Sequence, residues 1–221
     1  STPQHENFTF AAQTHAAQVV GGDYYDFIPF ENELLGIVLG DVSGKGVPAA
    51  LQMARLMSDF RYISQVDQEP GKVLAQVNNT LCERSYRGMF TTAVFCILDM
   101  KTRKLSVANG GHMSLLLKRN GSIQQICPAS GTPLGIIPNM QYKQEDHVLE
   151  SGDQILIFTD GMTEPKNKQE EEFGTDRLKD MFANNTASPE EFLQNLETSI
   201  KQFIGDAPQF DDLTSLTFKA L

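Results

Sequence analysis

Residues 34–48 of the chain are LLGIVLGDVSGKGVP, an apolar run that ends at Asp41 and continues into a glycine-rich turn. A second apolar run, QILIFTDG at residues 154–161, ends at Asp160 in the same way. The centre of this second run has no polar face, which predicts a strand that is buried on both sides. The repeated arrangement predicts two core strands whose ends carry carboxylates.

Alternating and β-rich segments on both sides of these runs predict further strands. The expected strands are residues 8–14, 24–29, 34–39, 92–98, 104–108, 114–118, 123–126, 142–149, 154–159 and 213–219. Apolar positions at helical spacing predict helices at residues 48–63, 72–83, 177–183 and 189–203. Because strands outnumber helices and the helices come in two widely separated pairs, we expect an α+β fold of antiparallel sheets covered by helices.

The composition is that of a folded domain with an acidic surface. Hydrophobic residues make up 40% of the 221 residues and charged residues 21%, so a sizeable core can be buried. The formal net charge of −10 makes nucleic acid and anionic membranes poor partners. We expect residues 1–221 to form a single domain.

The cysteine pattern indicates a reducing compartment, and the polar first residues do not resemble a signal peptide. Cys82, Cys96 and Cys127 form no C-x-x-C pair, which argues against a disulfide framework or a zinc cluster. Residues 1–7 are polar, and no apolar run approaches the roughly 20 residues that a membrane helix needs. We therefore expect a cytoplasmic protein, and because the chain does not begin with Met we expect it to be part of a longer one.

Aspartates stand at the ends of several predicted strands, where loops on a rigid sheet can bring them to one edge. They are Asp23, Asp41, Asp160, Asp211 and Asp212. Carboxylates at close range repel each other, and cations remove that penalty. Oxygen-only ligands favour Mg²⁺ or Mn²⁺ over zinc. Any one of these aspartates alone is better explained as a turn or helix cap, but the pattern as a whole favours a metal site.

Six motifs occur in an order that resembles the SpoIIE/RsbU-type branch of the PPM (PP2C-like) metal-dependent serine/threonine phosphatases. They are Gly21-Gly22-Asp23-Tyr24-Tyr25-Asp26-Phe27, Asp41-Val42-Ser43-Gly44-Lys45-Gly46, Asn109-Gly110-Gly111-His112, Gly131-Thr132-Pro133-Leu134-Gly135, Thr159-Asp160-Gly161 and Asp211-Asp212-Leu213-Thr214. The resemblance extends from about residue 8 to residue 218. It implies a four-layer α-β-β-α sandwich of two antiparallel sheets flanked by helix pairs, with two Mn²⁺ or Mg²⁺ ions at one edge.

The resemblance also implies roles for individual residues. Asp41 would bridge the two ions, and Asp23 with the carbonyl of Val42 would hold one of them. Asp160 and Asp211 would hold the other. Two neighbouring aspartates remain as alternatives or supports: Asp212 would support the ligands, while Asp26 could exchange roles with Asp23.

Such a centre would activate a water for in-line attack on a phosphomonoester, without a covalent phosphoenzyme. Where better-known PP2C enzymes carry a His shortly after the bridging aspartate, this chain has Ser43. No phosphate-binding Arg precedes Asp23, since the first Arg is Arg55. Both departures are expected for the SpoIIE/RsbU branch, and we expect water to supply the proton to the leaving group.

Other readings of single motifs explain less of the sequence. Gly22-Asp23-Tyr24 resembles the signature of diguanylate cyclases, but that reading leaves Asp160 and Asp211 unexplained. Lys45 lies in a glycine-rich turn whose spacing does not match a P-loop. His112 is better explained as a brace at a sheet edge than as a ligand. A catalytically silent PPM fold that acts as a binding module remains an alternative.

The resemblance implies partners as well. The substrate would be a phosphorylated STAS-domain anti-sigma-factor antagonist in a bacterial partner-switching pathway. The chain would be the C-terminal output domain of a longer regulator, downstream of a sensor or receiver domain. The helix pair at residues 48–63 and 72–83 would receive that input or mediate a homodimer. The polar loop at residues 164–172 follows the Asp160 strand and would border the substrate groove.

Overall fold

The computed structural model describes residues 2–84 and 88–221, and these residues form ten strands in two five-stranded antiparallel sheets. The strands are β1 (Phe8–His15), β2 (Tyr24–Pro29), β3 (Leu34–Val42), β4 (Thr91–Asp99), β5 (Lys104–Gly110), β6 (Leu115–Arg119), β7 (Ser122–Ile126), β8 (Gln144–Val148), β9 (Gln154–Phe158) and β10 (Leu213–Ala220). One sheet has the order β1-β10-β9-β6-β7 and the other β2-β3-β4-β5-β8. The first and last strands pair along their whole length, from Phe8 with Ala220 to His15 with Leu213.

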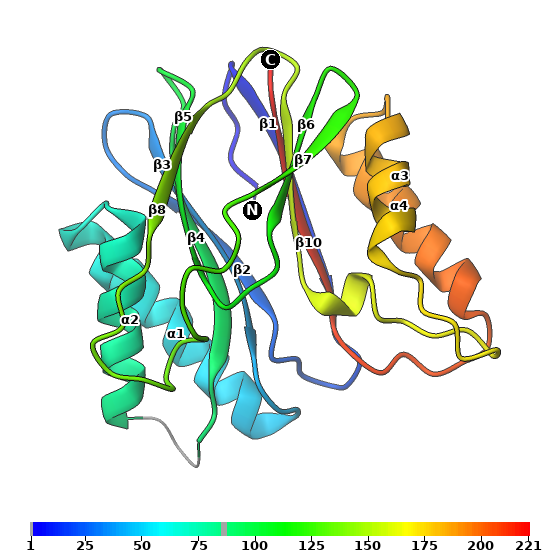
Figure 1. Cartoon of the computed structure of the whole chain (residues 1–221), viewed down its shortest axis with the longest axis horizontal. Coiled ribbons are helices and arrows are strands. Elements are labelled where there is room, and N and C mark those ends of the chain that lie inside the picture. The colour runs from blue at the N-terminus through cyan, green and yellow to red at the C-terminus, as the bar shows by residue number, and fades with distance from the viewer. Residues whose placement is uncertain (1, 85–87) are drawn as a thin grey trace.

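Helix pairs cover the outer faces of the two sheets (Figure 1). Helices α1 (Val47–Val66) and α2 (Pro70–Arg84) pack on the sheet that contains β3, β4 and β5. Helices α3 (Thr175–Asn184) and α4 (Pro189–Ile204) pack on the other sheet, against β7, β1 and β10. None of the helices in the described ranges combines the length and hydrophobicity that crossing a bilayer requires.

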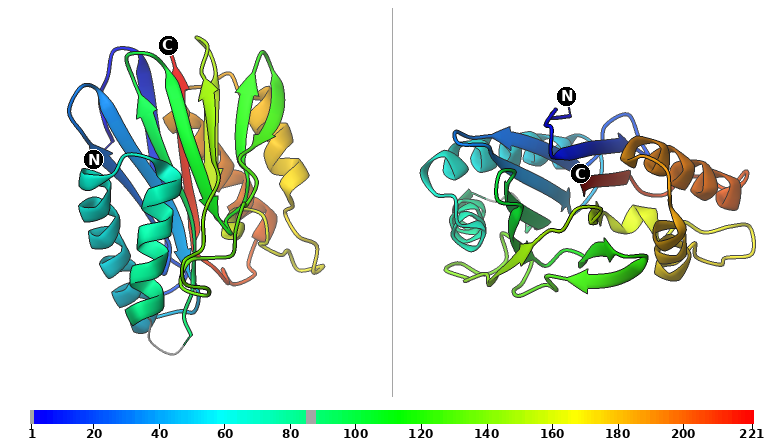
Figure 2. Two further views of the ribbon diagram at one scale, coloured as in Figure 1. Left: turned by 60° about the vertical axis from the view of Figure 1, so that its left-hand side comes forward. Right: turned by 90° about the horizontal axis from the view of Figure 1, so that it is seen from above.

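Three apolar cores hold these layers together. The middle core lies between the sheets and includes Phe10, Leu39 and Ile157. The two outer cores lie beneath the helix pairs, one around Phe60 and one around Phe182. The views in Figure 2 show the same succession of helices, two sheets and helices. The predicted four-layer α-β-β-α sandwich is therefore confirmed.

The predicted elements are present with ends that differ by at most three residues. Strand β9 is buried along its whole length, as its apolar sequence predicts. Residue 142 was expected to begin a strand, but β8 begins at Gln144 because Tyr142 turns into the core beneath α2, where its hydroxyl donates to the carbonyl of Thr132.

The strand predicted at residues 34–39 continues further than expected before the glycine-rich turn begins. Strand β3 continues to Val42, and Asp41 still pairs with Thr92 of β4. Asp41 is therefore held within the ladder instead of on a loose turn. The short 3-10 helix η1 (Asp160–Met162), which has no counterpart among the predicted elements, likewise anchors Asp160 directly after β9. Both departures make the carboxylates more rigidly placed than the sequence suggested.

Candidate metal centre

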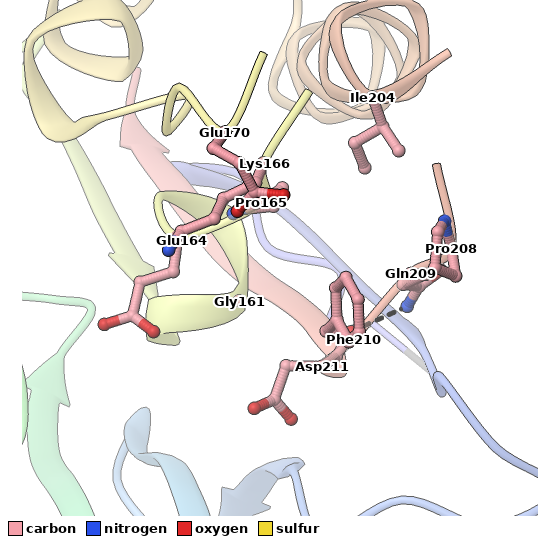
Figure 3. Close-up of a pocket in the computed structure, with 10 residues that line it drawn as sticks. All are labelled: Gly161, Glu164, Pro165, Lys166, Glu170, Ile204, Pro208, Gln209, Phe210 and Asp211. Carbon is pink, nitrogen blue, oxygen red and sulfur yellow. Dashed lines mark hydrogen bonds between the residues drawn. The ribbon is translucent and has the colours of Figure 1, made fainter. Parts of the chain in front are cut away.

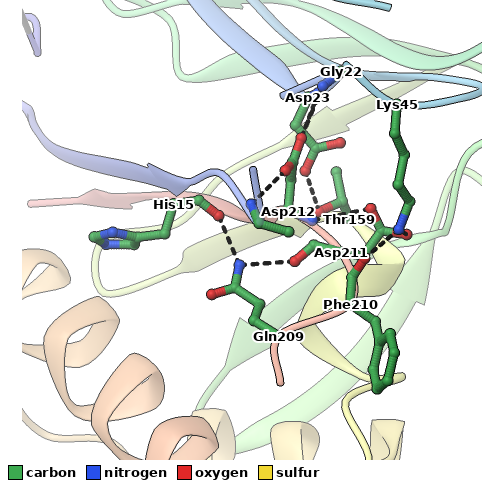
Figure 4. Close-up of polar contacts among 10 residues, drawn as sticks. His15, Gly22, Asp23, Lys45, Thr159, Gln209, Phe210, Asp211 and Asp212 are labelled. Carbon is green, nitrogen blue, oxygen red and sulfur yellow. Dashed lines mark hydrogen bonds and ion pairs between the residues drawn. The ribbon is translucent and has the colours of Figure 1, made fainter. Parts of the chain in front are cut away.

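The predicted carboxylates come from four separate segments that meet at one edge of the sandwich, where their charges act on one another. Figure 4 shows two of them, Asp23 and Asp211. Asp23 immediately precedes β2, and Asp41 lies at the end of β3. Asp160 opens η1 after β9, and Asp211 precedes β10. Each of these segments is anchored by a core strand, so the edge is held by the fold and not by the loops themselves.

Asp23 is the most deeply buried of these carboxylates and joins the two sheets. Its Oδ2 accepts a 2.8 Å hydrogen bond from the hydroxyl of Thr159, at the end of β9. Burial and the neighbouring charge of Asp41 raise the pKa of Asp23 to about 9. A carboxyl held this far above its usual pKa lies where negative charge is strongly disfavoured unless a cation compensates it.

The pKa values of Asp41 and Asp160 are also raised. Burial and the charge of Asp160 raise the pKa of Asp41 to about 6. Burial and the charge of Asp211 raise the pKa of Asp160 above its usual value. These three aspartates and Asp211 therefore act as one mutually repelling group, as their pattern in the sequence predicts.

Asp212 plays a different part from the aspartate beside it. One oxygen of its buried carboxylate accepts from the N–H of Ala17 at 2.8 Å. The other accepts from the N–H of Gly22 at 2.8 Å and of Asp23 at 3.3 Å. Because backbone donors occupy both oxygens, Asp212 holds the segment that carries Asp23. This geometry agrees with the supporting role expected of it.

Glycines allow these segments to approach. A Cβ on Gly21 would lie 2.1 Å from Oδ2 of Asp212. A Cβ on Gly161 would lie 1.9 Å from the backbone carbonyl oxygen of Asp212. A Cβ on Gly22 would lie 2.8 Å from the carbonyl oxygen of Val42. The Val42 carbonyl therefore lies against the segment of Asp23, the carboxylate with which it was expected to share an ion.

The structure places Asp26 away from this group. Arg61 of α1 binds its carboxylate through two hydrogen bonds, from Nε to Oδ2 at 2.6 Å and from Nη2 to Oδ1 at 2.9 Å. Asp26 lies on β2, and its charge is not among the main causes of the raised pKa values of Asp23, Asp41 and Asp160. Of the two aspartates that sequence left interchangeable, the structure favours Asp23.

Ser43 is bound to the backbone of a neighbouring segment. Its Oγ accepts from the N–H of Phe90 at 2.9 Å, and its own N–H donates to the carbonyl of Phe90 at 2.9 Å. These bonds tie the turn after β3 to the segment that enters β4. Ser43 thus serves the loop, and the expectation that water supplies the leaving-group proton stays a prediction.

His112 connects the two sheets beside the site, which is the bracing role predicted for it. Its Nδ1 and the hydroxyl of Thr92 are 2.8 Å apart, and its Nε2 is 3.0 Å from the carbonyl oxygen of Phe158. Thr92 and Phe158 belong to different sheets, so the imidazole links them. Burial lowers the pKa of His112 to about 4, so the ring is neutral at physiological pH. Asn109 supports this turn by donating to the carbonyl of His112 at 3.1 Å.

One residue at this edge was missed as a site residue by sequence reasoning. Lys45, considered only in connection with a P-loop, extends its ammonium group to Asp211, with Nζ 3.4 Å from Oδ2. It also donates a hydrogen bond to the carbonyl of Phe210. The signal available in the sequence was a cation placed four residues after Asp41 in a glycine-rich turn.

A cavity of about 360 Å³ adjoins the carboxylates on the side of α4 (Figure 3). Asp211 and Phe210 form one wall, and Glu164, Lys166 and Glu170 of the loop after η1 form another. The expectation that the loop at residues 164–172 borders a groove next to the Asp160 strand agrees with this arrangement.

The donor set fits hard divalent cations. It consists of oxygen atoms only, carries excess negative charge, and shows the raised pKa values that bound cations would reverse. Within residues 2–84 and 88–221, no three His, Cys, Asp or Glu side chains are already close enough to form a complete set of metal ligands. The carboxylates lie near enough to raise one another's pKa values, but they do not form a coordination shell.

The sandwich of two antiparallel sheets flanked by helix pairs is the fold of PP2C-type phosphatase domains. The model of the family Stage II sporulation protein E (SpoIIE) matches residues 31–221, and the chain belongs to this family. The family match and the fold leave no support for the diguanylate cyclase alternative.

Individual relatives agree with this assignment. The chain is 28% identical over 218 residues to "Phosphoserine phosphatase RsbU" of Bacillus subtilis, covering 98% of this chain and 64% of that protein. The first curated relatives are longer, and the chain spans 38–64% of their length.

Solved structures share the fold, as two examples show. The SiaA-PP2C domain of Pseudomonas aeruginosa superposes with a TM-score of 0.85 at 22% identity, over 95% of this chain and 85% of that one. The structure of RsbX in complex with magnesium superposes with a TM-score of 0.75 at 17% identity, over 100% of this chain and 99% of that one.

Proposed function

We propose that this domain is a divalent-metal-dependent protein phosphatase that hydrolyses phosphoserine or phosphothreonine by a two-metal mechanism. The observation that supports it most directly is the meeting of Asp23, Asp41, Asp160 and Asp211 at one edge, with three raised pKa values. Membership of a family whose relatives include phosphoserine phosphatases supports the reaction class.

In this proposal the carboxylates divide between two Mn²⁺ or Mg²⁺ ions. Asp41 would contribute to both ions, Asp23 and the carbonyl of Val42 would hold one, and Asp160 and Asp211 would hold the other. Bound ions of this kind supply a water of lowered pKa and neutralise charge on the phosphoryl oxygens. Thr159 orients Asp23, and Asp212 holds the backbone on which Asp23 sits.

The substrate we propose is a phosphorylated STAS-domain anti-sigma-factor antagonist in a bacterial partner-switching pathway, in the cytoplasm. Support comes from the resemblance to RsbU-type phosphatases and from the 28% identity to RsbU. The cavity beside Asp211, with its mixed acidic and apolar walls, offers room for residues that flank the phosphorylated one. An upstream sensor or receiver domain, or a second copy of the chain, would act through α1 and α2.

The proposal is tested by hydrolysis of p-nitrophenyl phosphate in Mn²⁺, in Mg²⁺ and in EDTA, with the wild type and Asp41→Asn. We expect activity that requires metal and is lost in the variant. Asp26→Asn is the matched control, because Asp26 lies on β2 but is bound by Arg61. Loss of activity in Asp26→Asn with retention in Asp41→Asn would overturn the ligand assignment.

A catalytically silent PPM-fold binding module is the second candidate. Calorimetric titration with Mn²⁺ separates the two, because the carboxylates that a phosphatase needs are the same ones that bind the ions. Binding without hydrolysis would indicate a phosphatase that awaits its upstream domain. Absence of both binding and hydrolysis would indicate the binding module.

A further inference from the structure

Lys45 is the cation that reaches the candidate metal centre from the turn between β3 and α1. Its ammonium group lies 3.4 Å from Oδ2 of Asp211 and donates to the carbonyl of Phe210 (Figure 4). Its charge also reaches Asp160, whose raised pKa it partly offsets. The charge of Lys45 thus acts on two carboxylates of the centre, those of Asp211 and Asp160.

The backbone of the turn directs Lys45 towards this edge. Gly44 and Gly46, on either side of it, have φ values of 98° and 75°, which L residues with side chains rarely adopt. A Cβ on Gly44 would meet nothing within 4 Å, so conformation and not space requires glycine there. The two glycines bend the chain after the end of β3, and Lys45 between them reaches the segment before β10.

The ammonium group retains capacity for another partner. A lysine has three N–H donors, and Phe210 and Asp211 account for two of them. The side chain is 47% exposed, so the remaining donor is accessible from solvent. Phosphate oxygens are strong acceptors for such a donor.

Two other basic residues that line cavities at this edge are engaged elsewhere or uncharged. Lys166, on the wall of the adjoining cavity, is 3.8 Å from Glu172. His112 is neutral at physiological pH, because burial lowers its pKa to about 4. Among residues 2–84 and 88–221, no other Lys or Arg forms an ion pair with Asp23, Asp41, Asp160 or Asp211.

Charge balance indicates what this cation is for. The net charge of four carboxylates and two divalent cations is about zero. A bound phosphomonoester contributes one or two further negative charges. That excess needs a positive group from the protein, placed at the open side of the centre.

We propose that Lys45 binds the phosphoryl group of the substrate. This inference rests on the proposed function, since it names the group that holds the phosphate at the same site. It assigns to Lys45 the positive charge that sequence reasoning sought in an early arginine and did not find.

The test measures binding of inorganic phosphate to the Mg²⁺-loaded protein by the shift in thermal stability with phosphate concentration. The variants are Lys45→Met, which removes the charge but keeps the length, and Lys45→Arg, which keeps the charge. The control is Lys104→Met, because Lys104 is 48% exposed and ion-paired with Asp146 at 2.8 Å, at the far end of β5. Mg²⁺ affinity of each variant is measured separately by calorimetry.

We expect Lys45→Met to weaken phosphate binding by roughly tenfold or more, as loss of a charge-assisted hydrogen bond implies. Lys45→Arg should retain most of the affinity, Lys104→Met all of it, and Mg²⁺ affinity should not fall in any variant. Michaelis constants for p-nitrophenyl phosphate should rise in parallel in Lys45→Met.

Three outcomes would overturn the inference: unchanged phosphate affinity in Lys45→Met, no phosphate binding by the wild type, or a loss fully accounted for by weaker Mg²⁺ binding. The last would make Lys45 a positioning residue for Asp211. Phosphate binding through Lys45 in a wild type without hydrolysis would support this inference while contradicting the proposed function.

Discussion

The hydroxyl of Thr159 donates a 2.8 Å hydrogen bond to Oδ2 of Asp23, and this bond joins the end of β9 to the start of β2. The two residues are separated by 136 positions in the chain and belong to segments of different sheets. The most buried carboxylate of the candidate metal centre is thus oriented by the residue directly before another candidate ligand, Asp160.

Replacing Thr159 by Val tests this orientation while keeping the shape of the side chain. Because a buried acceptor loses its donor, we expect the free energy of unfolding to fall by about 1–3 kcal/mol. Mn²⁺ affinity should fall as well, since Asp23 is no longer held. Urea denaturation and calorimetric titration measure the two effects. Thr198→Val is the control, because its hydroxyl bonds only the carbonyl of Gln194 on an exposed helix face. Wild-type Mn²⁺ affinity in Thr159→Val would contradict the assigned role.

The stability of the metal-free protein should depend on pH in a direction set by Asp23. Its pKa is raised to about 9 in the folded state, so between the unfolded value near 4 and pH 9 the folded state holds a proton that the unfolded state releases. The contribution of Asp23 to stability should therefore be fully present below pH 4 and fall by up to about 1.4 kcal/mol per pH unit towards pH 9. Asp41, with a pKa of about 6, adds to the fall between pH 4 and pH 6.

Urea unfolding in EDTA at pH 6, 7, 8 and 9 measures this slope. Asp23→Asn should flatten it, because the amide does not titrate. In Mn²⁺ the slope should also shrink, and Mn²⁺ affinity should rise with pH because binding displaces the protons. Equal slopes for the wild type and Asp23→Asn in EDTA would show that Asp23 is not the group responsible.

Asp212→Ala should separate support of the centre from metal binding. Its carboxylate accepts from three backbone N–H groups, of Ala17, Gly22 and Asp23. Leaving them without a partner should lower the free energy of unfolding by about 2–4 kcal/mol even in EDTA. Asp211→Ala, whose residue is exposed, should cost little stability in EDTA but weaken Mn²⁺ binding. Thermal unfolding with and without Mn²⁺ distinguishes the pair, and equal stability losses in EDTA would contradict the division of roles.

His112 should oppose the aspartates in acid. Its pKa of about 4 in the folded state lies below the unfolded value near 6.5, so the unfolded state binds the extra proton. The contribution of His112 to stability is therefore present above pH 6.5 and is lost as the pH falls from 6.5 to 4. His112→Gln should remove this part of the profile, which chemical denaturation between pH 4 and pH 7 would detect. An unchanged profile in that range would show that the pKa of His112 is not lowered in the folded state.

The sequence predicted much of the candidate site because its carboxylates follow strands that are themselves easy to recognise. Asp41 and Asp160 end the two most apolar runs, and a strand buried on both faces has few other interpretations. The directions of side chains between distant segments were not predictable in this way. Asp26 and Asp23 stand in one motif and looked equivalent, but α1 brings Arg61 to Asp26.

By itself, the sequence determined the α+β class, the order of the elements and the set of aspartates that could serve a metal centre. These follow from local periodicity, from turn residues and from motifs in register, all of which act over short stretches of chain. Only the tertiary structure decided that Asp212 binds the backbone of Gly22, that Thr159 holds Asp23, and that Lys45 faces Asp211. The reason is physical: each of these contacts joins residues more than 100 positions apart, and only the packing of the two sheets and the connecting loops brings them within hydrogen-bonding or ion-pair distance.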